Sequence, residues 1–146
     1  AASPPAATRA ALEAATLCLL NRERTRRGLR RVGSSPTLTS VARGHATAMV
    51  RRKFFAHTTP AGITFLDRVR ASGYLRRRPF AVGEVLAWAR RGTPVGQVRA
   101  LMRSPPHREI ILTPSFRSVG VGVAIGTPSR VVRRGTVTVA NFGRVG

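Results

Sequence analysis

Two β-rich runs near the end of the chain, SFRSVGVGVAIG (residues 115–126) and VVRRGTVTVANFG (residues 131–143), decide the fold class. Valine and threonine are enriched in strands, and the turn sequence Gly126-Thr127-Pro128-Ser129 separates the two runs. We therefore expect an antiparallel hairpin. Most of the chain before it has helical periodicity, and helices followed by strands indicate an α+β layered domain.

The segments before the hairpin are predicted from apolar spacing, caps and breakers. We expect a helix over residues 7–28, with Leu12, Ala15, Leu19 and Leu20 on its apolar face, and a second helix opening at Ser34-Ser35-Pro36. Further helices are predicted over residues 64–71 and 94–103 and from Ser104 to just before Pro114, and residues 79–89 alternate like a strand.

The chain has 146 residues, which suits one domain with a real core. We predict a flexible segment over residues 1–8 and a single domain over residues 9–146. No apolar run approaches the roughly 18 residues that a membrane span needs, and no signal-peptide pattern opens the chain. We expect a monomer without a transmembrane segment, and we expect the lone Cys18 to be a buried small hydrophobe.

The net charge is +21, and all but one of the 26 basic residues are arginine. Such a charge attracts polyanions, including cell-envelope polymers, although a codon-biased source would give the same composition. Aromatic residues make up only 5% of the chain, and no helix-turn-helix or zinc-finger pattern is present. We therefore expect no specific nucleic-acid binding.

Glu84 is the most informative of the five acidic residues. Strand alternation places it on the same face as large apolar side chains such as Phe80 and Trp88. A buried carboxylate is costly unless it is paired, hydrogen-bonded or bound to a cation. Glu84 is therefore either half of a structural ion pair with an arginine or part of a site.

Three other polar residues have both a structural and a functional interpretation. His107 falls in the first turn of a helix capped by Ser104, where the helix dipole lowers the pKa and favours neutral imidazole. Asp67 is spaced from Thr64 like the acid of a capping box. His45 lies on an apolar helical face, which is typical of a core histidine.

Seven motifs in a fixed order resemble the CAP superfamily, also called SCP-like or PR-1-like, in its compact bacterial secreted form. The motifs are LLNRERTRRGL (19–29), FFAHTTPAG (54–62), FLDRVRASGY (65–74), GEVLAWA (83–89), SPPHREIIL (104–112), VGVGVAIG (119–126) and the final NFG (141–143). The resemblance departs from the family pattern at Val85, Ile110 and Val137–Ala140, where polar or aromatic residues are usual.

The resemblance implies a three-layer α-β-α sandwich with a central, mainly antiparallel sheet, in an extracellular protein. It also implies a central cleft that holds two histidines and two acids, which map to His57, Asp67, Glu84 and His107. Such a set suits a divalent metal ion, with zinc favoured. Glu84, His57 and His107 are also the candidates for catalysis.

Three functions follow from these observations. The first is a secreted binding module whose cleft holds a divalent cation, a small ligand or a lipid. The second is a hydrolase that uses a metal or the histidine and acid side chains, although the sequence has no HExxH motif or nucleophile elbow. The third is a polyanion binder driven by charge.

Overall fold

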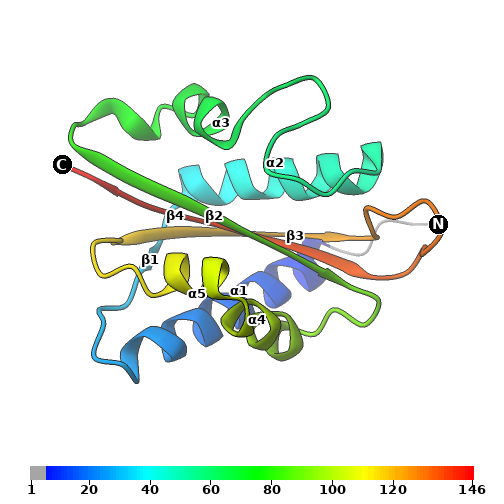
Figure 1. The fold of residues 1–146 in the computed structure, drawn as a ribbon, viewed down its shortest axis with the longest axis horizontal. Helices are drawn as coiled ribbons and strands as arrows, with labels where there is room; N and C mark the ends of the chain where they lie inside the picture. The colour runs from blue at the N-terminus through cyan, green and yellow to red at the C-terminus, as the bar shows by residue number, and fades with distance from the viewer. Residues whose placement is uncertain (1–5) are drawn as a thin grey trace.

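The protein is described by a computed structural model that covers residues 6–146, and its centre is a four-stranded sheet (Figure 1). The strands are β1 (Gly33–Ser34), β2 (Phe80–Ala89), β3 (Ser118–Ile125) and β4 (Thr136–Val145), arranged in the order β1-β3-β4-β2. Strands β3 and β4 form the predicted antiparallel hairpin, and β2 pairs antiparallel with β4. The two-residue strand β1 was not predicted; it adds to β3 in parallel.

Helices cover both faces of the sheet (Figure 1). Helices α2 (Pro36–Arg52) and α3 (Phe65–Ala71) lie on one side, and α1 (Ala6–Thr25), α4 (Pro94–Arg103) and α5 (Pro105–Ile111) lie on the other. A short 3-10 helix over Tyr74–Arg76 follows α3. The protein is therefore an α-β-α sandwich, which confirms the predicted fold class. No helix of the described residues is both long enough and apolar enough to cross a membrane.

Helix α2 packs unusually close to β3 because β3 presents glycines to it. A Cβ atom added at Gly120 would lie 2.0 Å from the backbone carbonyl carbon of Leu38, and one added at Gly122 would lie 2.3 Å from the backbone nitrogen of Arg43. The alternating valines of the same strand point to the opposite face, where Val119, Val121 and Val123 join the core beneath α1. The VGVGV pattern thus sets the distance between the sheet and helix α2.

Helix α1 buries Leu20 as predicted, and Leu12 and Leu19 pack partly buried against the core, but Ala15 is exposed and polar residues complete the buried face. The buried residues recur at helical spacing and include polar side chains: Glu13, Thr16, Leu20 and Arg24. Arg24 is fully buried and donates hydrogen bonds of 2.8 Å to the carbonyl oxygens of Arg30, Ile111 and Thr113, which join the end of α1 to the segment after α5. Cys18 is exposed, so its predicted burial is wrong.

The first and last residues of helix α1 differ slightly from those of the helix predicted over residues 7–28. Helix α1 begins at Ala6, inside the segment over residues 1–8 that was predicted to be flexible, while residues 1–5 lie outside the described residues. The helix ends at Thr25, three residues before Gly28, whose φ of +77° is the left-handed conformation that glycine adopts at helix ends.

Candidate functional site

Glu84 lies in the middle of β2, with 3% of its surface exposed. Its Oε1 atom is 2.8 Å from His57 Nδ1, and because a carboxylate only accepts hydrogen bonds, the histidine is the donor. Arg68 donates from Nη1 to Oε2 at 2.9 Å and from Nη2 to Oε1 at 3.2 Å. The carboxylate is therefore held between an imidazole and a guanidinium group.

The electrostatics of this group keep Glu84 ionised. Burial alone would raise the pKa of its carboxyl, but the hydrogen bonds from His57 and Arg68 and the charge of Arg68 outweigh burial and lower it. Glu84 is thus an anion at neutral pH. Because Nδ1–H of His57 is donated to that anion, Nε2 is left without a hydrogen-bond partner among residues 6–146, on a side chain that is 53% exposed.

The loop between α2 and α3 places His57 over the sheet. Helix α2 ends at Arg52, and the next residue, Lys53, adopts the left-handed conformation with φ of 56° and turns the chain. Phe54 packs against the core beneath α2, whereas Phe55 is 44% exposed, so only Phe54 anchors the start of the loop. Arg68 also donates to the carbonyl oxygen of His57, which fixes the loop at the site.

His107 is the third residue of α5, as predicted. Its Nδ1 atom lies 2.7 Å from Ser104 Oγ, and Ser104 uses its hydroxyl for this contact rather than for capping the helix. Burial lowers the pKa of His107, and the nearby charge of His57 lowers it further. The lowered pKa agrees in direction with the prediction, and burial is its largest cause.

Asp67 does not join these residues. It forms a capping box with Thr64: its carboxylate accepts from the Thr64 N–H at 3.0 Å, and its own N–H donates to Thr64 Oγ1 at 3.1 Å. These bonds lower the pKa of the exposed Asp67 carboxyl. Because successive helical residues point about 100° apart, Arg68 faces the sheet instead. Throughout residues 6–146, no three His, Cys, Asp or Glu side chains gather closely enough to share a metal ion.

Two buried polar residues border the site without full hydrogen bonding. His45 is 2% exposed, which confirms its place in the core, and its Nε2 donates to the Ala56 carbonyl at 2.8 Å. Burial lowers its pKa, and the charge of Arg68 lowers it further. Asn141 is paired with Glu84 across β2 and β4 and is fully buried. Within the described residues, His45 Nδ1 and both amide atoms of Asn141 have no hydrogen-bond partner.

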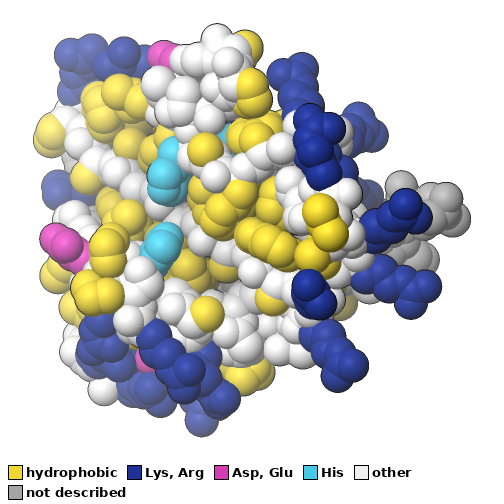
Figure 2. Space-filling view, turned by 45° about the vertical axis from the view of Figure 1, so that its right-hand side comes forward, with side chains coloured by type: hydrophobic (Ala, Val, Ile, Leu, Met, Phe, Trp, Pro, Cys, Tyr) yellow, Lys and Arg dark blue, Asp and Glu magenta, His cyan; other side chains and the backbone are white. Residues whose placement is uncertain are grey.

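Sequence reasoning missed Arg68 and Asn141. Each stands in a quoted motif, Arg68 in FLDR and Asn141 in NFG, but nothing in one sequence shows that they meet at Glu84. Figure 2 shows two histidine side chains exposed on one face, with hydrophobic surface around them. A pocket of about 510 Å³ adjoins this region; α2, the following loop and α3 line it, and His45, Arg68 and Ile63 are among its residues.

The family to which this fold belongs is identified by comparison with known proteins. Residues 17–142 match the model of the CAP, or cysteine-rich secretory protein, family, and the chain therefore belongs to that family. It is 33% identical over 104 residues to the uncharacterized protein YkwD of Bacillus subtilis, covering 71% of this chain and 39% of that protein.

Solved structures agree with this assignment at the level of the fold. An extracellular protein with an SCP domain from Bacillus anthracis has a TM-score of 0.75 and 24% identity, over 93% of this chain and 41% of that one. An outer surface protein of Borrelia burgdorferi has a TM-score of 0.73 and 20% identity, over 89% of this chain and 90% of that one. The chain thus spans about two fifths of the two Bacillus proteins.

Proposed function

We propose that the protein is an extracellular CAP-domain binding module whose cleft, at His57, Glu84 and His107, holds a divalent cation or a small ligand or lipid. The observation that carries the proposal is the buried Glu84 anion, which engages Nδ1 of His57 and leaves Nε2 free. The extracellular location is supported by the descriptions of two structural relatives, one as extracellular and one as an outer surface protein.

Zinc is the cation that fits these donors best. A histidine that binds zinc usually donates its other ring nitrogen to a carboxylate or another acceptor, and Nδ1 of His57 and of His107 meets Glu84 and Ser104 in this way. The two Nε2 atoms would be the ligands, and Glu84 would orient His57 instead of binding the metal. Because no third donor joins them in residues 6–146, water or a bound ligand would complete the coordination.

The test is the thermal stability of the metal-free protein with and without zinc. Zinc should raise the melting temperature of the wild type, because a ligand that binds only the folded state adds about 2.7 kcal/mol at a hundredfold excess over Kd. The double variant His57→Ala/His107→Ala should show no rise. Glu84→Gln should bind zinc about 10- to 100-fold more weakly, since it loses the group that orients His57.

One outcome and one control test whether zinc binds through the two histidines. Equal rises in the wild type and the double variant would exclude the two histidines as ligands. Magnesium serves as a matched control, because it prefers oxygen donors and should leave the melting temperature of both proteins unchanged.

A hydrolase is the second candidate, supported by the contact between Ser104 Oγ and His107 Nδ1 at 2.7 Å. A serine hydroxyl beside a neutral imidazole is the smallest arrangement in which a base can activate a nucleophile. In this reading a fluorophosphonate probe should label the wild type and leave Ser104→Ala unlabelled. Thr58→Ala is the control, because Thr58 follows the other cleft histidine. Equal labelling of all three proteins, or of none, would exclude this reaction.

A further inference from the structure

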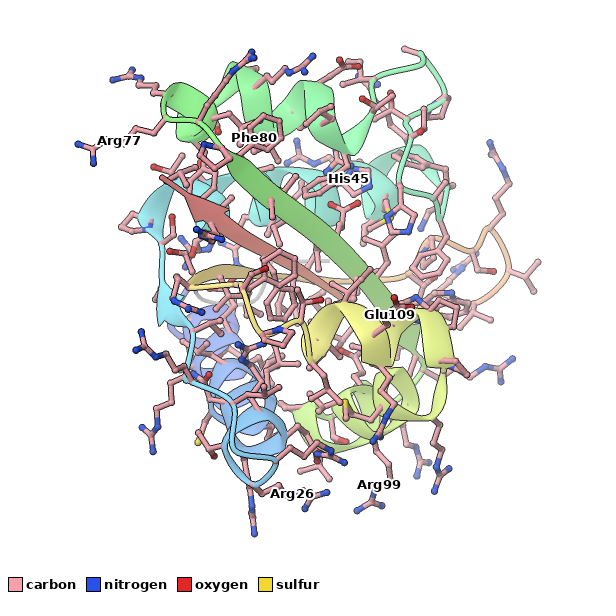
Figure 3. All side chains as sticks on the ribbon, turned by 60° about the vertical axis from the view of Figure 1, so that its left-hand side comes forward. Arg26, His45, Arg77, Phe80, Arg99 and Glu109 are labelled. Atoms are coloured by element: carbon pink, nitrogen blue, oxygen red, sulfur yellow. The ribbon has the colours of Figure 1, made fainter. Side chains whose placement is uncertain are left out.

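A second concave region lies on the other face of the sheet from Glu84, between α1 and α4. It is a groove of about 470 Å³ with Leu19, Val98 and Met102 among its apolar lining. Six arginines line the same groove, from the end of α1 and the turn that follows it, from α4 and from α5: Arg22, Arg26, Arg27, Arg99, Arg103 and Arg108. Figure 3 shows two of them, Arg26 and Arg99, extending from the same edge of the molecule. We call this region the α1–α4 groove.

The positive charge of the α1–α4 groove is only slightly neutralised. Its one acid is Glu23, whose Oε2 atom lies 3.1 Å from Arg26 and 2.7 Å from Arg27. In residues 6–146, the other four arginine side chains form no ion pair and no hydrogen bond. Exposed guanidinium groups with free donors match phosphate oxygens in geometry and charge.

The arrangement favours a chain of negative charges over a single one. Arg26 follows the end of α1, and its N–H still donates to the carbonyl oxygen of Arg22 one turn earlier. Arg99 and Arg103 are one turn apart on α4, so each pair is about 6 Å apart along its helix axis. A single phosphate group cannot pair with all the arginines of these two rows, so positive charge would remain for further phosphates. No aromatic side chain lines the groove, so it offers no platform on which nucleic-acid bases could stack.

We propose that the α1–α4 groove binds a linear, base-free phosphate polymer through these arginines. The apolar floor contacts the chain between its charges, and the guanidinium groups of α1 and α4 hold successive phosphates from either side. This site is separate from the histidine cleft and does not depend on the function proposed for it. It also places the charge-driven polyanion binding considered from composition at one defined surface.

The experiment compares two triple variants with the same change in net charge. Arg22→Gln/Arg99→Gln/Arg103→Gln alters the groove, and Arg130→Gln/Arg133→Gln/Arg134→Gln alters exposed arginines of the β3–β4 connection. Sodium polyphosphate is the probe, and its affinity is measured by titration over a range of salt concentrations, with circular dichroism as the check of folding. Thymidine homopolymer and vesicles of phosphatidylglycerol are the competing probes.

The groove variant should lose at least about tenfold in affinity at about 150 mM salt, and its slope of log affinity against log salt should fall by about 2 to 3. The control variant should lose less than about threefold. Equal losses in both variants would overturn the proposal, because they would mean binding to net charge alone. Tighter binding of the DNA or the vesicles through the same arginines would also overturn it.

Discussion

At the scale of single residues, the site depends on how one buried acid is neutralised. The sequence identifies Glu84 as a residue that needs a partner, and it leaves open an ion pair or a functional site. The structure shows the ion pair with Arg68, and it also shows that the same carboxylate accepts a hydrogen bond from Nδ1 of His57. Under the proposed function, the same carboxylate would carry a structural role and a binding role.

Glu84→Gln is expected to destabilise the protein at neutral pH by about 3 kcal/mol, because it leaves the mostly buried Arg68 without its anion. The folded-state pKa of Glu84 lies below its unfolded value, so its contribution is present above the ordinary glutamate range and is lost as pH falls through the folded pKa. Urea unfolding from pH about 7 to about 3.5 should show the difference between wild type and variant shrinking. A difference that stays constant over this range would contradict this role.

At the scale of elements, the contact between α2 and β3 positions the layer that carries the site. His45 lies on α2, and the loop that carries His57 follows α2 directly. The depth of this helix is set by Gly120 and Gly122, where its backbone occupies the space of a side chain. The glycines of β3 therefore influence the position of the loop that carries His57, although neither lies in that loop.

Gly122→Ala should destabilise the protein by about 3 kcal/mol, because the new methyl group would overlap backbone atoms that cannot move alone. Gly44→Ala is the matched control within α2. Its added Cβ meets nothing within 4 Å, and alanine is a better helix former by about 1 kcal/mol, so this change should stabilise. Chemical denaturation of both variants is the measurement; equal effects would show that close packing is not what the β3 glycines provide.

At the scale of the whole molecule, the net charge of +21 is spread over both helical layers. Few acids are available to offset it, and two of the five, Glu13 and Glu84, are buried in ion pairs. Repulsion among the remaining arginines therefore opposes the compact state. The fold withstands this repulsion through its two apolar cores, one on each face of the sheet.

Salt should consequently stabilise the protein. Raising sodium chloride from about 20 to about 500 mM screens the exposed arginines from one another and should raise the melting temperature by a few degrees, equivalent to about 1 kcal/mol. The buried Glu84 pair is screened much less and should not reverse the trend. A melting temperature that falls with salt would show that attractive surface pairs, not repulsion, dominate.

The sequence predicted most helices and strands because their caps, breakers and alternation are local signals. Pro94–Arg103 has the predicted bounds, and the β3–β4 hairpin is confirmed. The prediction from sequence failed for β1, whose two residues have no pattern of their own and form a strand only by pairing with β3. The prediction also missed the polar part of the buried face of α1, where Arg24 is stabilised by distant carbonyl oxygens that no periodicity reveals.

By itself, the sequence determined the fold class and the family resemblance, because turn chemistry, strand alternation and motif order are readable one segment at a time. It also identified His57, Glu84 and His107 as candidate site residues. Only the tertiary structure decided that Asp67 caps its helix while Arg68 reaches Glu84, and that Asn141 lies beside them. Which side chain meets a buried charge depends on the packing of segments far apart in the chain, and that packing is a property of the whole fold.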